Sequence, residues 1–148
     1  MTMSNSPFNS VFENSLRLLI LFDIFEKPQT LDMLYATDFM TIYGATFGMS
    51  KVNLNGERAY KFSEFASRRE LIKLAVKDLV LSGFLKPLCS SQGMVYSITE
   101  EGKCYCKKLD SDYAKEYRRV AINVIENSLR KTGRELINCI NNISVNNK

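Results

Sequence analysis

The stretch from Ser67 to Leu109 constrains the fold of this chain more than any other part of the sequence. It predicts an amphipathic helix (SRRELIKLAVKDLVLSGF), then a short hairpin (LKPLCSSQGMVYSIT), then a second helix (EEGKCYCKKL). A helix with glycine at its end, two short strands around a polar tip and a capped helix are together typical of a winged helix-turn-helix. That fold class favours the binding of nucleic acid or of other proteins, and it argues against catalysis.

Local signals predict both ends of the first of these helices. Ser67 and Glu70 match a capping box, in which each side chain satisfies a backbone N–H at the start of a helix. Gly83 is a candidate for the left-handed residue that closes the helix. The residues expected to form its buried stripe follow helical spacing: Leu71, Leu74, Ala75 and Leu79, with Ile72 and Val76 beside them.

The hairpin and the helix after it also carry recognisable turn and cap residues. The two strands are expected at Leu85–Leu88 and Val95–Ile98, and the polar residues and glycine between them (SSQG) suit a hairpin tip. Thr99 is a candidate N-cap for the next helix. The tip contains no Arg or Lys, which argues mildly against a wing that grips the minor groove of DNA.

Two further helices are predicted before this region. The first runs from about Phe8 to Glu26 and is ended by Lys27-Pro28, because proline cannot continue a helix. The second runs from Leu31 to about Tyr43, with Thr30 as its N-cap. Residues 45–61 carry turn-forming Gly and Asn, and they predict a long functional or variable loop.

The 148 residues suit one domain with terminal segments that are disordered. The expected divisions are a disordered N-terminus at 1–7, a winged-helix domain at 8–110, a helical extension of that domain at 111–143, and a disordered tail at 144–148. The extension reads as one long helix that starts at Ser111 or Asp112 and reaches the region of Ile137 to Ile140. The fold class is therefore mostly α with a small β-hairpin.

Composition argues against an enzyme. The chain has no histidine, which removes the commonest general base and metal ligand, and it has neither a P-loop nor a GxGxxG motif. We therefore expect no catalytic residue, cofactor or metal. We also expect no membrane contact, because no apolar run is long enough to span a bilayer. Reduced thiols in a cytoplasmic protein are expected, and a metal site made only of cysteine is the weaker alternative for three of the four: Cys89, Cys104 and Cys106.

A basic ridge is expected on the outside of the helix that starts near Ser67. Arg69, Lys73 and Lys77 recur at four-residue spacing, and Arg68 lies beside them. Lys86 is the nearest basic residue of the hairpin. Such a ridge could enter the major groove of DNA, contact phosphates without reading sequence, bind a protein partner, or be an ordinary solvated face. The net charge of +4 permits contact with phosphate but does not demand it.

The C-terminal helix is expected to contact a second protein chain. Its apolar stripe continues through Leu129, Leu136 and Ile140, next to a basic face. A helix so long could not bury its whole stripe within so small a domain, so we expect its distal half to pack on a second chain. The alternative is that it packs back on the first helix of the same chain.

Three segments resemble one known family. The N-terminal SPFNSVFENSLRLLILF, the central FSEFASRRELIKLAVKDLVLSGFLKPL and the later YSITEEGKCYCKKLDSDYAKEYRRVA are similar, in order and spacing, to the middle component of ABC-three-component systems, also called Lamassu-type antiphage defence. The resemblance extends from about Pro7 to Asn123. The loop at 45–61 lacks the features expected of relatives, so no role is carried over to it.

The resemblance implies a non-enzymatic adaptor that holds an effector, often a nuclease, on an SMC-like ABC ATPase. Under this hypothesis double-stranded DNA, bound non-specifically, is a further partner. The basic residues named above would make the polar contacts to a partner or to DNA, and the apolar anchors would be Phe8, Phe12, Leu129, Leu136 and Ile140. The alternative hypothesis is a dimeric winged-helix regulator of transcription. It would bind one operator roughly a thousandfold or more tightly than random DNA.

Overall fold

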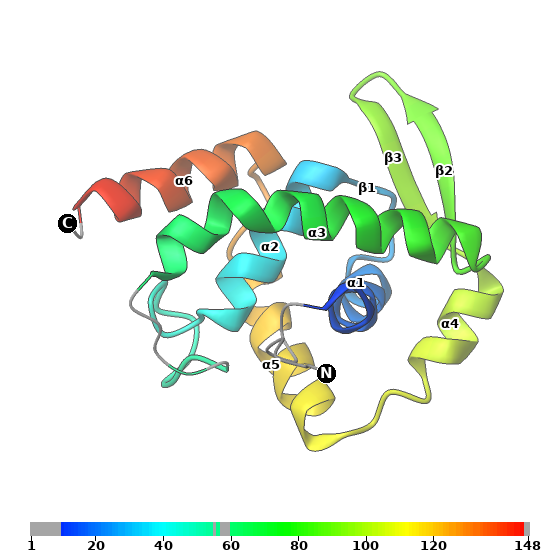
Figure 1. The fold of residues 1–148 in the computed structure, drawn as a ribbon, viewed down its shortest axis with the longest axis horizontal. Coiled ribbons are helices and arrows are strands. Elements are labelled where there is room, and N and C mark those ends of the chain that lie inside the picture. The colour runs from blue at the N-terminus through cyan, green and yellow to red at the C-terminus, as the bar shows by residue number, and fades with distance from the viewer. Residues whose placement is uncertain (1–9, 55, 57–59, 147–148) are drawn as a thin grey trace.

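The protein is mostly helical with one small sheet, as the computed structural model in Figure 1 shows. The structure describes residues 10–54, 56 and 60–146. The long helix α3 crosses the molecule, the hairpin of β2 and β3 rises near one end of it, and α6 lies above the other. In chain order the elements are α1 Val11–Phe25, β1 Gln29–Thr30, α2 Leu31–Ile42, α3 Lys61–Leu81, β2 Leu85–Ser90, β3 Gly93–Ile98, α4 Glu100–Cys106, α5 Asp112–Glu126 and α6 Gly133–Asn146.

The sheet confirms the predicted hairpin and adds a third strand to it. Strands β2 and β3 are antiparallel and pair from Leu85 opposite Ile98 to Ser90 opposite Gly93. The two-residue strand β1 lies on the other side of β3, so the order is β1-β3-β2. A strand of two residues cannot show an alternating pattern, which explains why the sequence did not reveal it.

Three predicted helix ends are confirmed. The Thr30 hydroxyl accepts a hydrogen bond from the backbone N–H of Met33 at 3.1 Å, and the Thr99 hydroxyl accepts one from Gly102 at 3.0 Å. Gly83 has a φ of +82° just after α3, a conformation that favours glycine. These signals act within one helical turn, so they can be read without knowledge of the tertiary structure.

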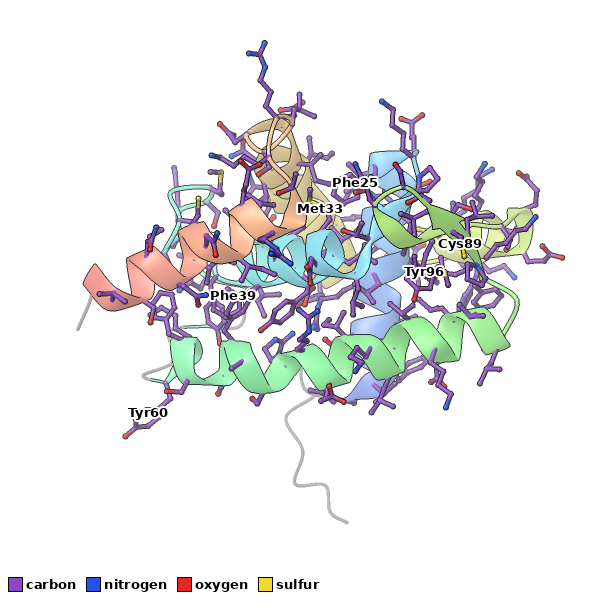
Figure 2. The ribbon with its side chains drawn as sticks, turned by 90° about the horizontal axis from the view of Figure 1, so that it is seen from above. Phe25, Met33, Phe39, Tyr60, Cys89 and Tyr96 are labelled. Atoms are coloured by element: carbon purple, nitrogen blue, oxygen red, sulfur yellow. The ribbon has the colours of Figure 1, made fainter. Side chains whose placement is uncertain are left out.

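The start of α3 was predicted wrongly. The helix begins at Lys61, and Ser67 lies inside it, where its hydroxyl donates to the carbonyl oxygen of Glu64 at 2.9 Å. The additional turns bring Phe65 against the ring of Phe39 on α2, with 4.6 Å between the ring centroids. Figure 2 shows Phe39 at the end of the molecule opposite Cys89 and Tyr96 of the hairpin. Burial of this aromatic layer extends the helix past the local capping signal.

The buried face of α3 also differs from the predicted stripe. Leu74 was expected in the core, but 49% of its surface is exposed. The residues that face the core are Phe65, Arg68, Ile72, Ala75, Val76 and Leu79. The difference arises because an arginine, Arg68, occupies a core position, and a pattern of apolar residues alone cannot place it there.

The predicted single C-terminal helix is two helices, α5 and α6. The break coincides with a capping box that the prediction missed. The Thr132 hydroxyl accepts from the backbone N–H of Glu135 at 3.2 Å, and the Glu135 carboxylate accepts from the backbone N–H of Thr132 at 2.8 Å. Gly133 allows the new helix to touch the first turn of α2, because a Cβ there would lie 2.5 Å from the backbone nitrogen of Met33.

The break lets α6 fold back on α2 of the same chain. Leu136 is 1% exposed and Ile140 is not exposed at all. Both residues belong to the core of this chain, so the prediction that they anchor a second chain is wrong. The apolar stripe is buried within this chain because the chain changes direction after α5. A single straight helix could not have brought the stripe back onto α2.

A buried ionic cluster joins four helices, and sequence reasoning did not identify it. The Asp38 carboxylate of α2 accepts from the Arg17 Nε of α1 at 2.9 Å, from the Arg68 Nη2 of α3 at 3.0 Å and from the Tyr117 hydroxyl of α5 at 2.6 Å. Asp38 is 1% exposed, and its two arginine partners are 2% and 4% exposed. The available signal was a charged residue inside each of two apolar runs (LRLLIL and ATDFM).

Among the residues that the structure describes, two guanidinium groups meet one carboxylate in this cluster. Asn14 compensates part of the excess positive charge, because its side-chain oxygen accepts from Arg17 Nη2 at 2.6 Å and from Arg68 Nη2 at 3.1 Å. Burial alone would raise the pKa of Asp38, but the charges of Arg17 and Arg68 and the hydrogen bonds from Arg17 and Tyr117 hold that pKa below its usual range. The carboxylate is therefore ionised in the folded protein.

We predict that Asp38→Asn destabilises the protein by about 3–5 kcal/mol, because it removes the carboxylate that the buried guanidinium groups of Arg17 and Arg68 share. The measurement is the free energy of unfolding in urea, followed by circular dichroism. Asp78→Asn is the matched control, since Asp78 is exposed on the outside of α3. Equal stability of the two variants would show that the cluster contributes nothing.

The same cluster predicts how stability depends on pH. The folded-state pKa of Asp38 is lowered, so its contribution is complete above the unfolded-state pKa of about 4 and is lost as the pH falls below it. The wild type should therefore lose more unfolding free energy than Asp38→Asn between neutral and acidic pH. Parallel curves for the two proteins would contradict this.

We predict that Gly133→Ala loosens the contact between α6 and α2. The added Cβ would meet backbone atoms of Asp32 and Met33, which cannot rotate away. The expected cost is about 1–3 kcal/mol, despite the better helix propensity of alanine. Thermal unfolding measures it, with Asn141→Ala on the exposed side of α6 as the control. An unchanged or raised midpoint for Gly133→Ala would show that the two helices can separate without cost.

Candidate interaction surface

Arg68, the first residue of the expected basic ridge on α3, is buried in the core. Arg68 is 4% exposed and donates to Asp38 and Asn14. The prediction that Arg68 lies on the surface and contacts DNA or a partner is therefore wrong, because its guanidinium donates to residues of the ionic cluster. Spacing along the helix could not show this, since Arg68 and Asp38 are 30 residues apart.

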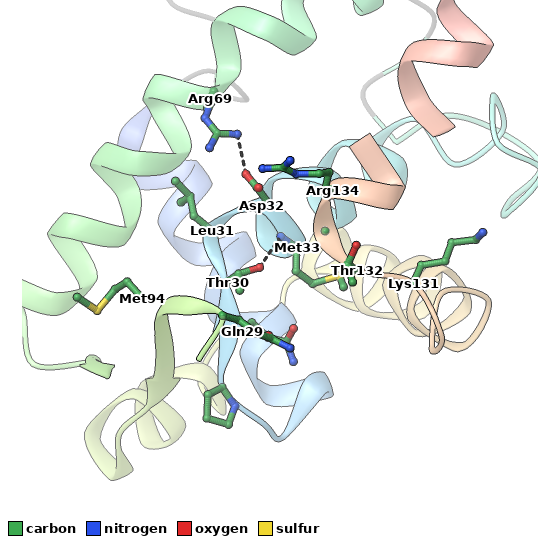
Figure 3. Close-up of a pocket in the computed structure, with 13 residues that line it drawn as sticks. Gln29, Thr30, Leu31, Asp32, Met33, Arg69, Met94, Lys131, Thr132 and Arg134 are labelled. Carbon is green, nitrogen blue, oxygen red and sulfur yellow. Dashed lines mark hydrogen bonds and ion pairs between the residues drawn. The ribbon is translucent and has the colours of Figure 1, made fainter. Parts of the chain in front are cut away.

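Arg69 lies at the surface but is paired. Its Nη1 is 2.8 Å from a carboxylate oxygen of Asp32 in the first turn of α2 (Figure 3). The guanidinium also lies over the ring of Tyr35, 5.5 Å from the ring centroid. The pair is partly exposed, so its guanidinium remains accessible to a ligand that approaches from this side.

The remaining predicted basic residues are exposed and do not form one ridge. Lys73 pairs with Glu70 of its own helix at 3.3 Å, and Lys77 has no ion-pair partner among the described residues. Lys86 is exposed on β2, where it lies opposite Ser97. Successive strand residues point to opposite faces, so Lys86 lies on the other face of the hairpin from Pro87, which faces α3. The positive charge available on α3 is smaller than the sequence indicated.

Apolar side chains take the place of the expected ridge on the outside of α3. Leu74 is 49% exposed and Leu81 is 74% exposed. Residues three and seven positions apart lie on one side of a helix, so Leu74, Lys77 and Leu81 form one strip. We call these three residues the α3 strip. Large exposed apolar side chains gathered in a row are typical of a surface that binds another protein.

Two residues of the α3 strip, Lys77 and Leu81, line a groove between α3 and the hairpin. The groove has a volume of about 340 Å³ and contains apolar side chains together with two lysines. No acidic residue of the described chain lines it. An apolar floor with a positive rim suits a partner segment that carries both apolar and acidic side chains. The lining residues are Leu31, Lys73, Val76, Lys77, Val80, Leu81, Pro87 and Tyr96.

The other predicted anchors do not line this groove. Phe12 on α1 is 60% exposed and borders a smaller hollow next to Leu79 and Phe84. Leu129, in the connection between α5 and α6, is 76% exposed. Phe8 lies outside the described residues. The anchoring roles of Phe12 and Leu129 stay predictions.

The cysteines do not form a cluster. Cys89 and Cys104 are exposed, while the buried Cys106 thiol donates to the carbonyl oxygen of Leu19 at 3.6 Å. Burial raises the pKa of Cys106, which keeps the thiol protonated. Within the part of the chain that the structure describes, no group of three Cys, Asp or Glu residues is arranged to hold a metal ion.

The length and polarity of the helices bear on membrane contact. None of the helices in residues 10–54, 56 and 60–146 is long and apolar enough to cross a bilayer. The longest, α3, has 21 residues, and charged side chains occur along its whole length.

Comparison with known proteins places almost the whole chain in one family. The family model described as Middle Component 2 of the ABC-three-component (ABC-3C) system matches residues 7–147. No curated protein and no solved structure matches the chain. The match includes the α3 strip, the groove and the ionic cluster.

Proposed function

We propose that this chain, which belongs to the Middle Component 2 family of ABC-three-component systems, is a non-enzymatic adaptor in a defence complex of Lamassu type. Its partners in this proposal are an SMC-like ABC ATPase and an effector nuclease, which it bridges in the cytoplasm. The observation that carries the proposal is the groove beside the α3 strip, because a subunit placed between two others needs an exposed surface that can bind protein.

The order of the elements supports a winged helix-turn-helix as the scaffold of this adaptor. Helix α1 is followed by β1, α2 and α3, and then by the β2-β3 hairpin, with the three strands in the order β1-β3-β2. In this interpretation α3 corresponds to the recognition helix and the hairpin to the wing. The groove then lies where the recognition helix and the wing meet.

The charge of α3 favours protein over DNA as its ligand. Arg68 is buried, Arg69 is paired with Asp32, and Lys73 is paired with Glu70. A recognition helix that reads bases needs several free donors in the major groove. Leu74 and Leu81 are exposed on the same side of α3 as Lys77. The hypothesis of a sequence-specific regulator is correspondingly weaker.

The chemistry of the groove indicates what kind of partner segment would bind there. Val80, Leu81 and Tyr96 offer apolar surface, and the side chains of Lys73 and Lys77 also line the groove. An amphipathic helix with apolar residues on one side and Asp or Glu beside them would suit the groove. Its apolar residues would be buried there, and its carboxylates would pair with Lys73 and Lys77. The expected anchors on the partner are therefore leucine-like residues flanked by carboxylates.

A catalytic role has little support from the ionisable groups. The largest pKa shifts belong to residues of the buried cluster: burial raises the pKa of Tyr117, and Asp38 raises that of Arg17 against the effect of burial. These groups hold helices together and are inaccessible to a substrate. We therefore expect the purified chain to show neither ATPase nor nuclease activity by itself.

The test is a pull-down of the tagged chain expressed with the proteins encoded beside it. The wild type should retain the ATPase and the nuclease, as identified by mass spectrometry. The double variant Leu74→Glu, Leu81→Glu should lose at least one of them, because it places carboxylates on the apolar strip without disturbing the core. Both positions are exposed in the free chain, so the variant should fold, and its circular dichroism spectrum checks this.

The double variant Val52→Glu, Val145→Glu is the matched control, since it adds the same charge at residues that are 68% and 67% exposed and do not line the groove. It should retain both partners. If the Leu74 and Leu81 variant also retains both, the α3 strip is not the binding surface. If the wild type itself recovers no partner, the adaptor proposal is wrong.

A further inference from the structure

A second hollow, next to the groove, has a different chemical character. It lies between the start of α2 and the start of α6 (Figure 3), and Gln92 of the hairpin tip also lines it. Its volume is about 500 Å³. We call it the α2–α6 pocket. The residues that line it are Pro28, Gln29, Thr30, Leu31, Asp32, Met33, Arg69, Gln92, Met94, Lys131, Thr132, Gly133 and Arg134.

Positive charge predominates in the α2–α6 pocket. Arg69, Lys131 and Arg134 line it, and Asp32 is the one acidic lining residue in the described chain. Asp32 is already paired with Arg69 at 2.8 Å. Lys131 and Arg134 are exposed and have no ion-pair partner within the described ranges. Arg134 thus remains available to an anion at one rim of the hollow, and Lys131 lies beside it with its charge near the Glu135 carboxylate.

The backbone adds to this positive field. The helices α2 and α6 both begin at the pocket, so the positive end of each helix dipole lies there, together with one acidic residue in each first turn, Asp32 and Glu135. Their ends are in direct contact, since the Gly133 position lies so close to Asp32 and Met33 that no Cβ fits between them. The two helix starts alone would not define a ligand site. Together with Arg69, Lys131 and Arg134 they strengthen the attraction of an anion to the same place.

The hairpin supplies neutral contacts on the opposite side of the pocket. Gln92 at the tip offers amide donors, and Met94 is 46% exposed. Arginine, lysine, glutamine and threonine side chains together with helix N-termini are the groups that contact nucleic-acid phosphates. A single carboxylate of a peptide would use only a small part of a hollow of this size, whereas consecutive phosphates of a strand could contact both rims.

We propose that the α2–α6 pocket binds the phosphodiester backbone of a nucleic acid without reading its sequence. The contact residues are Lys131 and Arg134, with Gln92 on the hairpin side, and Arg69 lies beside them in its ion pair with Asp32. This site is separate from the outer face of α3, where Lys77 is the only ridge lysine without an ion pair among the described residues. The proposal does not depend on the adaptor function, because it concerns the purified chain alone.

The test measures binding of the purified full chain to labelled oligonucleotides by fluorescence anisotropy. The probes are a duplex and a single strand of equal length, of two unrelated sequences each, at about 50 mM and about 200 mM salt. The expected result is binding to both sequences equally, with affinity that falls as salt rises. The ratio of duplex to single-strand affinity shows which form of nucleic acid the pocket prefers.

The variant Lys131→Glu, Arg134→Glu should weaken binding by roughly tenfold or more, and the salt slope should fall by roughly 0.9 for each duplex phosphate contact that is lost. The matched control is Lys77→Glu, Lys86→Glu, which changes the net charge by the same amount on other surfaces. Its affinity should fall less. All four positions are exposed, and thermal unfolding verifies that both variants are folded.

Three outcomes would overturn the proposal. The first is equal loss of affinity in the two double variants, which would mean that only the overall charge matters. The second is no measurable binding of either probe at the lower salt concentration. The third is displacement of the duplex by polyglutamate as effectively as by unlabelled duplex, which would make the pocket a site for acidic protein.

Discussion

The buried carboxylate of Asp38 is the constraint on which the arrangement of the helices depends. It accepts hydrogen bonds from Arg17, Arg68 and Tyr117, and these residues belong to three different helices. A buried charge is costly unless it is paired and hydrogen-bonded, so only an arrangement that brings all three partners to Asp38 avoids a large penalty. Hydrophobic packing alone tolerates small rotations of a helix, whereas this set of directed contacts does not.

The rotation of α3 follows from the same contacts. Arg68 must point inward to reach Asp38, so Ile72 and Leu79, four and eleven positions later, point inward with it. The opposite side of the helix then presents Leu74, Lys77 and Leu81 to solvent. The exposed α3 strip is thus a consequence of the interior, and a change at Asp38 would alter which side chains this helix offers to a partner.

Much of the fold could be predicted because its signals are local. The hairpin, Thr30, Thr99 and Gly83 act within a few residues of themselves. The capping box of Thr132 and Glu135 is equally local and was readable, but the apolar stripe that continued across it masked the break. The expected 67–70 box failed for the opposite reason, since long-range aromatic packing extended the helix beyond it.

The candidate site could be predicted only in part, because its charges depend on partners far away in the sequence. Arg68 and Arg69 look alike in the sequence, yet one is buried against Asp38 and the other pairs with Asp32 at the surface. Helical spacing shows which side chains lie on the same side of a helix. It cannot show that this side faces the core when one of those side chains is an arginine. The pocket that contains Arg69 also needed the turn after α5, which the prediction of one long helix did not include.

The two surfaces meet at the first residue of α2. Leu31 lines both the groove beside α3 and the α2–α6 pocket, so ligands in the two places would lie next to each other. Because the ionic cluster ties α1, α2, α3 and α5 together, a ligand in one place has little freedom to move these helices. Any coupling between a protein partner and a nucleic acid would therefore come from direct contact or charge at this border. A partner with acidic residues in the groove would repel phosphates nearby, and so the acidic side of such a partner should face Lys73 and Lys77, away from Lys131 and Arg134.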